Sequence, residues 1–112
     1  MHRWQYDLKY MNAPLKPVVE RQLNTIPRGA GERFEVNVRN TLTDQVRMMK
    51  VAADDCVGHL MLDIIRSDHR LPAKWCLLSA AKNLMLLYTF EEYGIHPGQR
   101  MFIYEKMPSI LE

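Results

Sequence analysis

Two different apolar periods follow one another in this chain, and their order constrains the fold more than any other feature. From Phe34 the apolar residues alternate with polar ones through Val36 and Val38, which is the period of a half-buried strand. Between about residues 56 and 67 the apolar residues gather on one face at 100° per residue, as in an amphipathic helix. A strand segment followed by a one-sided helix predicts a helix that covers a sheet, and therefore an α+β fold.

The alternating run is the first half of a predicted hairpin. Residues 40–44 supply turn-forming residues, and a second apolar run follows at Val46, Met48, Met49 and Val51. The phase of this run slips by one residue between Met48 and Met49, which predicts a β-bulge in the second strand.

A helix is predicted from about residue 56 to residue 67. Asp54 or Asp55 precedes it and is placed to accept hydrogen bonds from the free amides of its first turn. The side chains expected to face the sheet are Val57, Leu60, Met61 and Ile64, with Leu62 and Ile65 at the margin. Gly58 costs a helix about 1 kcal/mol against alanine, so it marks a place of close packing or a near backbone.

Shorter elements are predicted in the C-terminal half. Pro72 ends the helical region, residues 75–78 and 84–87 have the character of short strands, and residues 90–93 resemble one helical turn. Residues 101–104 form the last predicted strand. The predicted order is two strands, a helix, two strands, a short turn and a final strand.

The N-terminal segment has a different composition. Residues 1–31 contain three prolines and two glycines and lack a sustained apolar period, so they are predicted to form an extended arm that ends in the flexible linker PRGAG. We expect the folded domain to span residues 32–105, with a short tail over residues 106–112.

Composition argues against several classes of function. With 112 residues the chain can bury one core but has little room for an enzyme cleft, so no small-molecule substrate is expected. Its net charge of +2 comes from scattered residues, so direct nucleic-acid binding is not expected either. Cys56 and Cys76 have neither disulfide nor zinc spacing. His59 and Asp63 could hold a metal at i and i+4, but no third ligand is evident, so no metal, cofactor or catalysis is expected. No apolar stretch is long enough for membrane insertion.

The late segment FEEYGIHPG carries a resemblance to a known fold. Phe90, Glu92, Tyr93 and Ile95 match residues that recur just before the last strand of the ubiquitin family. The chain therefore resembles a β-grasp, ubiquitin-like fold. The resemblance implies that Tyr93 packs over the loop leading to it and has a structural role.

Within that superfamily, the run from Asp54 to Leu60, DDCVGHL, looks like the DDTIGDL of the ubiquitin-like protein 5 family. Tyr93, Ile95, His96 and Gly98 likewise look like its DYEIHDG. These relatives are non-conjugated modifiers associated with mRNA splicing, which implies a location in the nucleus or cytoplasm. The last residues here are Ile110, Leu111 and Glu112 where conjugated relatives end in Gly-Gly, so conjugation through the C-terminus is not expected.

The resemblance also implies a site. Asp55 corresponds to the acidic residue with which that family binds an arginine on a short helix of its partner; the other interpretation is that Asp55 caps the helix. A surface ion pair contributes about 0–1 kcal/mol, so apolar neighbours must supply most of the affinity. Leu62 and Ile65 are the nearest candidates.

A second apolar surface is expected on the strand at residues 75–78. Trp75 and Leu77 alternate there with Cys76 and Leu78, and both sides of the strand cannot face the core. In ubiquitin the equivalent strand exposes the patch that most receptors bind, and Leu77 would fall near it. The alternative is that the N-terminal arm covers this surface, with Trp4, Tyr6 or Tyr10 as the filler.

The leading hypothesis is a non-catalytic protein-interaction module that docks without covalent attachment onto a larger assembly, such as the spliceosome. The alternative is a constitutive structural subunit of a large multi-subunit complex, mitochondrial or ciliary, in which the N-terminal arm threads along neighbouring subunits.

Overall fold

The alternating run forms an inner strand of a five-stranded mixed sheet in the computed structural model, which describes residues 13–106. The elements are α2 (Leu15–Leu23), β1 (Arg33–Asn40), β2 (Val46–Ala52), α3 (Val57–Ser67), β3 (Trp75–Ser79), β4 (Lys82–Asn83) and β5 (Arg100–Glu105). The strands lie in the order β2-β1-β5-β3-β4. Strand β1 is antiparallel to β2 and parallel to β5, and β3 is antiparallel to both β4 and β5. The predicted α+β class is confirmed.

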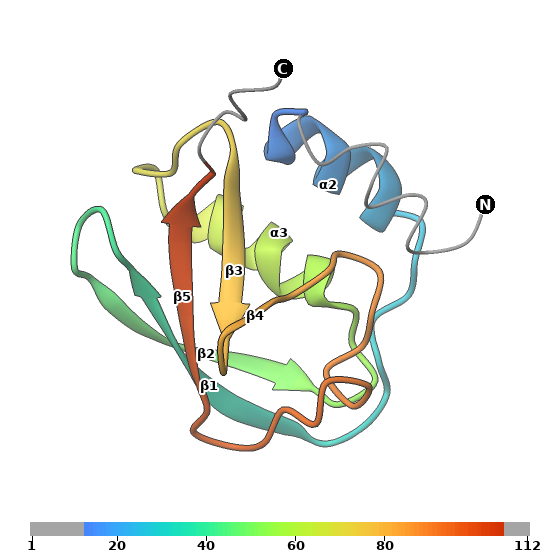
Figure 1. Cartoon of the computed structure of the whole chain (residues 1–112). Helices are drawn as coiled ribbons and strands as arrows, with labels where there is room; N and C mark the ends of the chain where they lie inside the picture. The colour runs from blue at the N-terminus through green and yellow to red at the C-terminus, as the bar shows by residue number, and fades with distance from the viewer. Residues whose placement is uncertain (1–12, 107–112) are drawn as a thin grey trace.

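Helix α3 covers one face of the sheet, as predicted. Figure 1 shows it behind the strands, with α2 packed beside it. Alternate residues of the strands turn toward α3, so Val36 and Val38 are buried in the same apolar cluster as Leu60 and Ile64 of the helix. Burial of this apolar surface is the main term that stabilises the fold. The opposite face of the sheet has no described helix over it (Figure 1).

The hairpin of β1 and β2 keeps one register from Arg33 opposite Ala52 to Arg39 opposite Val46. The predicted β-bulge is therefore wrong. The apolar phase slips because Val46 and Met48 point to the face away from α3, where each is 55% exposed, while Met49 and Val51 point toward the helix.

The start of α3 is satisfied by a segment from the other half of the chain. The N–H groups of Val57 and Gly58 donate to the carbonyls of Tyr88 and Leu86, at 2.8 and 2.9 Å. The prediction that Asp54 or Asp55 caps this helix is wrong, because backbone carbonyls already occupy that place.

The strand predicted at residues 84–87 is also wrong. Only Lys82 and Asn83 pair with β3, after a tight turn in which Ala80 and Ala81 have φ values of 50° and 62°. The chain then leaves the sheet and passes the start of α3, where Leu84 and Leu86 are buried. Their apolar character reflects this burial rather than strand pairing.

Residues 15–23 form helix α2, so the prediction of an extended arm is wrong for this segment. Pro17 is tolerated because it lies in the first turn, whose amides have no partner within the helix. Val19 and Leu23, one turn apart, are 0% and 2% exposed and belong to the same core as α3. Trp4, Tyr6 and Tyr10, expected as fillers, lie outside the described residues.

Candidate functional site

The adjacent carboxylates Asp54 and Asp55 bind the linker that follows α2. Asp55 is 1% exposed, and it accepts hydrogen bonds from the N–H groups of Gly29 (2.7 Å) and Ala52 (3.0 Å). Nη1 of Arg33 donates to the same carboxylate at 3.0 Å. Asp55, predicted to bind a partner's arginine, therefore has an arginine of its own chain as its partner.

Asp54 completes this arrangement from the solvent side. Its carboxylate accepts the N–H groups of Ala30 and Gly31, at 3.0 and 3.3 Å. A Cβ built on Gly29 would lie 2.0 Å from Oδ1 of Asp54, so only glycine allows the linker to approach this closely. The prediction of a flexible PRGAG linker is wrong, because three successive amides are fixed to two aspartates.

The environment of Asp55 favours its ionised form. Burial by itself raises the pKa of this carboxyl, but the N–H donors of Ala52 and Gly29 and the guanidinium of Arg33 outweigh that effect, so the pKa is below its ordinary value. At neutral pH Asp55 is a satisfied structural carboxylate.

His59 and Asp63 are also used within the fold. His59 is 1% exposed, its Nδ1 accepts the N–H of Cys56 at 3.0 Å, and its Nε2 lies 2.9 Å from the carbonyl oxygen of Ile26. Asp63 forms a two-pronged ion pair with Arg28, at 2.6 and 2.9 Å. His59 is therefore buried and bonded within the fold, and within residues 13–106 no cluster of metal-ligating side chains is present.

Three of the predicted apolar contact residues lie in the core. Leu62 and Trp75 are each 4% exposed and Leu77 is 0% exposed. The prediction that Leu77 lies on an exposed patch is wrong, because the inward-facing side chains of β3 are Trp75 and Leu77, whereas Cys76 and Leu78 face outward and are half-buried.

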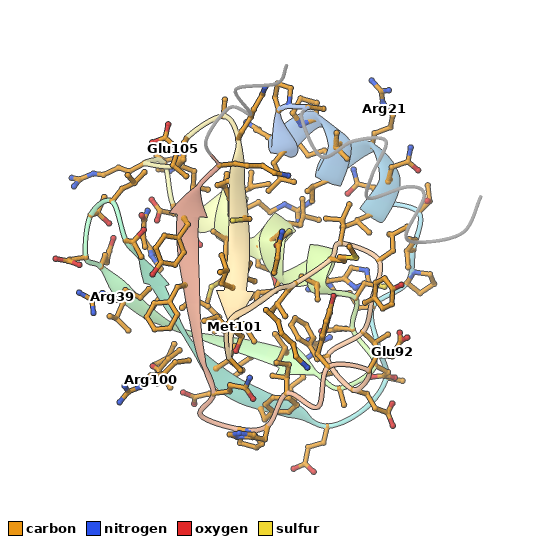
Figure 2. All side chains as sticks on the ribbon, viewed as in Figure 1. Arg21, Arg39, Glu92, Arg100, Met101 and Glu105 are labelled. Carbon is orange, nitrogen blue, oxygen red and sulfur yellow. The ribbon has the colours of Figure 1, made fainter. Side chains whose placement is uncertain are left out.

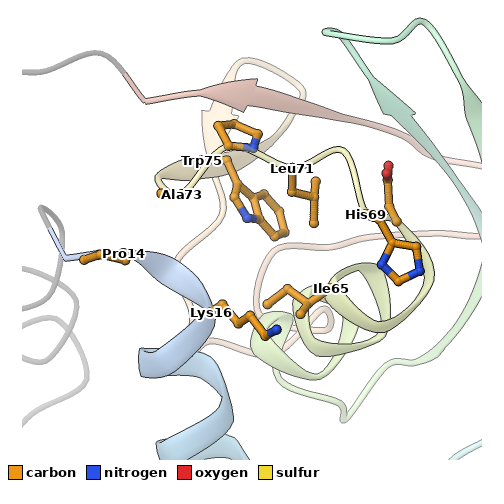
Figure 3. Close-up of a pocket in the computed structure, with 9 residues that line it drawn as sticks. Pro14, Lys16, Ile65, His69, Leu71, Ala73 and Trp75 are labelled. Atoms are coloured by element: carbon orange, nitrogen blue, oxygen red, sulfur yellow. The ribbon is translucent and has the colours of Figure 1, made fainter.

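Ile65 is the one predicted site residue that is partly exposed. It lines a hollow of ≈ 340 Å³ between α2, α3 and the start of β3, together with Lys16, His69, Leu71 and Trp75. Figure 3 shows Trp75 and Leu71 on one side of this hollow, and Ile65 of α3 with Lys16 of α2 on the other. The hollow brings Ile65 and Trp75 together, but Asp55 and Leu77 do not line it.

The face of the sheet opposite α3 carries apolar side chains, as the prediction of a second apolar surface requires, but they come from Cys76 and Leu78 of β3 and from β2 and β5, which were not predicted to contribute. We call it the open face, formed by the outward residues Asn37, Arg39, Val46, Met48, Cys76, Leu78, Arg100, Phe102 and Tyr104. Val46 and Met48 are 55% exposed and Tyr104 is 45% exposed. The rings of Phe102 and Tyr104 lie 6.4 Å apart between centroids.

A shallow hollow of ≈ 410 Å³ crosses the open face from β2 to β5. Its lining residues are Asn37, Arg39, Val46, Arg100, Met101 and Phe102. Figure 2 shows Arg39 and Arg100 projecting from the same side of the molecule. The hollow therefore combines an apolar base with two guanidinium groups and contains no carboxylate among its lining residues.

The two arginines differ in their partners. Arg39 is oriented by Asp44, whose Oδ1 accepts from Nη2 at 2.6 Å and from Nε at 3.2 Å. Arg100 has no ion-pair partner within the described part of the chain.

On β3, burial raises the pKa of the Cys76 thiol, so this outward-facing cysteine stays protonated at neutral pH.

Comparison with known proteins assigns no relationship: no protein-family model matches the chain, and no curated protein is significantly similar to it. Within residues 13–106, neither helix is long and apolar enough to cross a bilayer.

Proposed function

We propose that the chain is a non-catalytic, ubiquitin-like module that binds other proteins without covalent attachment, and that it does so through the open face. The observation that carries the proposal is the exposure of Val46, Met48 and Tyr104 on a sheet face with no described helix over it. With Leu42 in the neighbouring turn, these side chains expose on the order of 400 Å², in the range where a patch on a monomer is often functional.

The strand order and the central parallel pair are compatible with a β-grasp fold. Tyr93 adds to this likeness, because its hydroxyl accepts the N–H of Met85 at 2.9 Å and so fastens the loop that precedes it. This is the structural role that the resemblance implies for Tyr93. In ubiquitin the exposed patch lies on the third strand, and here the outward residues of that strand, Cys76 and Leu78, border Phe102 and Tyr104.

The resemblance makes the spliceosome the first assembly to test, but its contact residue is not free. Asp55 is enclosed by Gly29, Ala52 and Arg33, so a partner's arginine would have to displace bonds within the chain. We therefore assign docking to the open face and a structural role to the acidic pair.

A quantitative pull-down from the protein's native cells tests the proposal. The tagged full chain is compared with a Met48→Ser/Tyr104→Ser double variant, and Arg66→Ser is the control because Arg66 is exposed on α3, away from the open face. Serine at exposed sites should leave the thermal unfolding midpoint nearly unchanged. We expect the double variant alone to lose its partners.

If the double variant keeps every partner while folding normally, the open face is not the docking surface and the proposal fails. If the partners are one assembly of fixed stoichiometry and the isolated chain aggregates, the module is a constitutive subunit of that complex. The threading role imagined for the arm could then involve only residues outside the described part, because residues 15–31 bind the domain itself.

A further inference from the structure

We infer that the partner segment is acidic as well as apolar, and that its carboxylate binds between Arg39 and Arg100 while an apolar side chain enters the hollow beside Phe102. This inference rests on the proposed docking function and specifies the chemistry of the partner. It begins from the register of the sheet, in which Asn37 pairs with Arg100 and Arg39 pairs with Phe102. The two guanidinium groups therefore flank one aromatic ring.

The charge of the hollow is unbalanced. All of its charged lining residues are arginines, and within the described residues only Arg39 has a carboxylate partner. Asp44 engages Nε and Nη2 of Arg39, which fixes the direction of that guanidinium before a ligand arrives. Arginine presents a planar set of donors that matches a carboxylate, and a partly desolvated pair of this kind sets specificity as well as association rate.

The apolar surroundings favour a protein ligand over a nucleic acid. Phe102 and Tyr104 offer rings for base stacking. Val46 and Met48, the more exposed apolar side chains of the face, are aliphatic and gain only from burial against apolar groups of a partner. Glu35 and Lys50, opposite each other at the other end of the hairpin, carry no net charge between them, so the two arginines do not continue into a basic track for a phosphate backbone. The hollow reaches from β5 to β2, about 10 Å at two strand spacings, which two turns of an amphipathic helix would cover.

The inference is tested by selecting binders to the full chain from a phage-displayed library of random peptides. Selected peptides are resynthesised and their dissociation constants measured for the wild type, Met48→Ser/Tyr104→Ser, Arg100→Glu and Arg66→Glu. Arg100 is the informative arginine because its reversal breaks no ion pair within the described fold. Arg66→Glu makes the same charge change at an exposed position of α3, on the other side of the sheet from the open face.

We expect the selected peptides to place Asp or Glu beside apolar residues and to lose about tenfold in affinity with Arg100→Glu but not with Arg66→Glu. A library selected on the Arg100→Glu chain should enrich Lys or Arg instead. Peptides that depend on Met48 and Tyr104 but are indifferent to Arg100→Glu would overturn the acidic preference and leave the docking function standing. A library that gives no binder sensitive to Met48→Ser/Tyr104→Ser or to Arg100→Glu would overturn both the acidic preference and the docking function. If a labelled oligouridylate binds more tightly than the peptides and depends on the same arginines, nucleic acid is the ligand instead.

Discussion

Replacing Gly58 by alanine should destabilise the fold, although alanine is the better helix residue. The added Cβ would lie 1.8 Å from Cδ1 of Leu23 and 3.1 Å from Cδ1 of Leu86. Leu23 is 2% exposed, so it cannot rotate away into solvent. Overpacking costs about 1–3 kcal/mol, and so short a contact belongs at the upper end, while helix propensity returns about 1 kcal/mol. The net loss is therefore about 2 kcal/mol in the free energy of unfolding.

A double-mutant cycle measured by urea unfolding separates these two terms. Leu23→Ala alone should cost about 2–5 kcal/mol because it empties a buried site. In that background the close contact with Leu23 is gone, so Gly58→Ala should become neutral or stabilising by up to about 1 kcal/mol. The coupling between the two positions should be about 2–3 kcal/mol, within the range for residues in contact. A neutral or stabilising Gly58→Ala in the wild-type chain would refute the packing of α2 on α3.

Three further outcomes follow from the geometry. Asp55→Asn should cost about 1–3 kcal/mol in urea unfolding, because the amide NH2 cannot accept a hydrogen bond and leaves the N–H of Gly29 or of Ala52 without an acceptor; an unchanged stability would contradict this. Since the folded-state pKa of Asp55 is lowered, its contribution is complete above about pH 5 and is lost as pH falls through the folded value, so wild type and Asp55→Asn should converge in stability on acidification. Ala80→Asn/Ala81→Gly should raise the thermal midpoint and stabilise by about 1–2 kcal/mol, because both alanines have positive φ; an unchanged midpoint would argue against that turn.

The elements with long, regular periods were predictable from the sequence. Helix α3 and strands β1, β2, β3 and β5 lie where the apolar spacing places them, because each buries one face against a common core. Close packing at Gly58 is confirmed by the contact with Leu23. Helix α2 was not predictable in this way, because only Val19 and Leu23 are buried on it and prolines interrupt its start. In the segment after β4, the carbonyls of Leu86 and Tyr88 accept the first N–H groups of α3. Backbone bonds of this kind leave no periodic pattern in the sequence.

The candidate site was harder to predict, for two physical reasons. Asp55 and His59 were recognisable as unusual polar residues, but sequence spacing cannot tell whether their partners belong to the same chain. The part of the open face on β2 was missed because two outward apolar residues followed by two inward ones give the same one-residue shift in the alternation as a β-bulge. The alternation of Val46 and Met48 is visible in the sequence. Only the register of β2 against β1 shows that it reflects outward-facing apolar residues and not a bulge.

The bonds that Asp55 makes within the chain also favour the open face over Asp55 as the docking site, on energetic grounds. A partner arginine that reached this buried carboxylate would have to replace Arg33 and open the linker that covers it, so the bond from Gly29 would also be lost. Each hydrogen bond to a charged group that is lost costs about 1.5–3 kcal/mol, whereas an exposed ion pair returns at most about 1 kcal/mol. Docking on the open face requires no such exchange, because Arg100 and the exposed side chains of β2 and β5 are already presented to solvent. A binding mode that does use Asp55 would have to release the linker, and hydrogen exchange at the amides of residues 29–31 would then accelerate on binding.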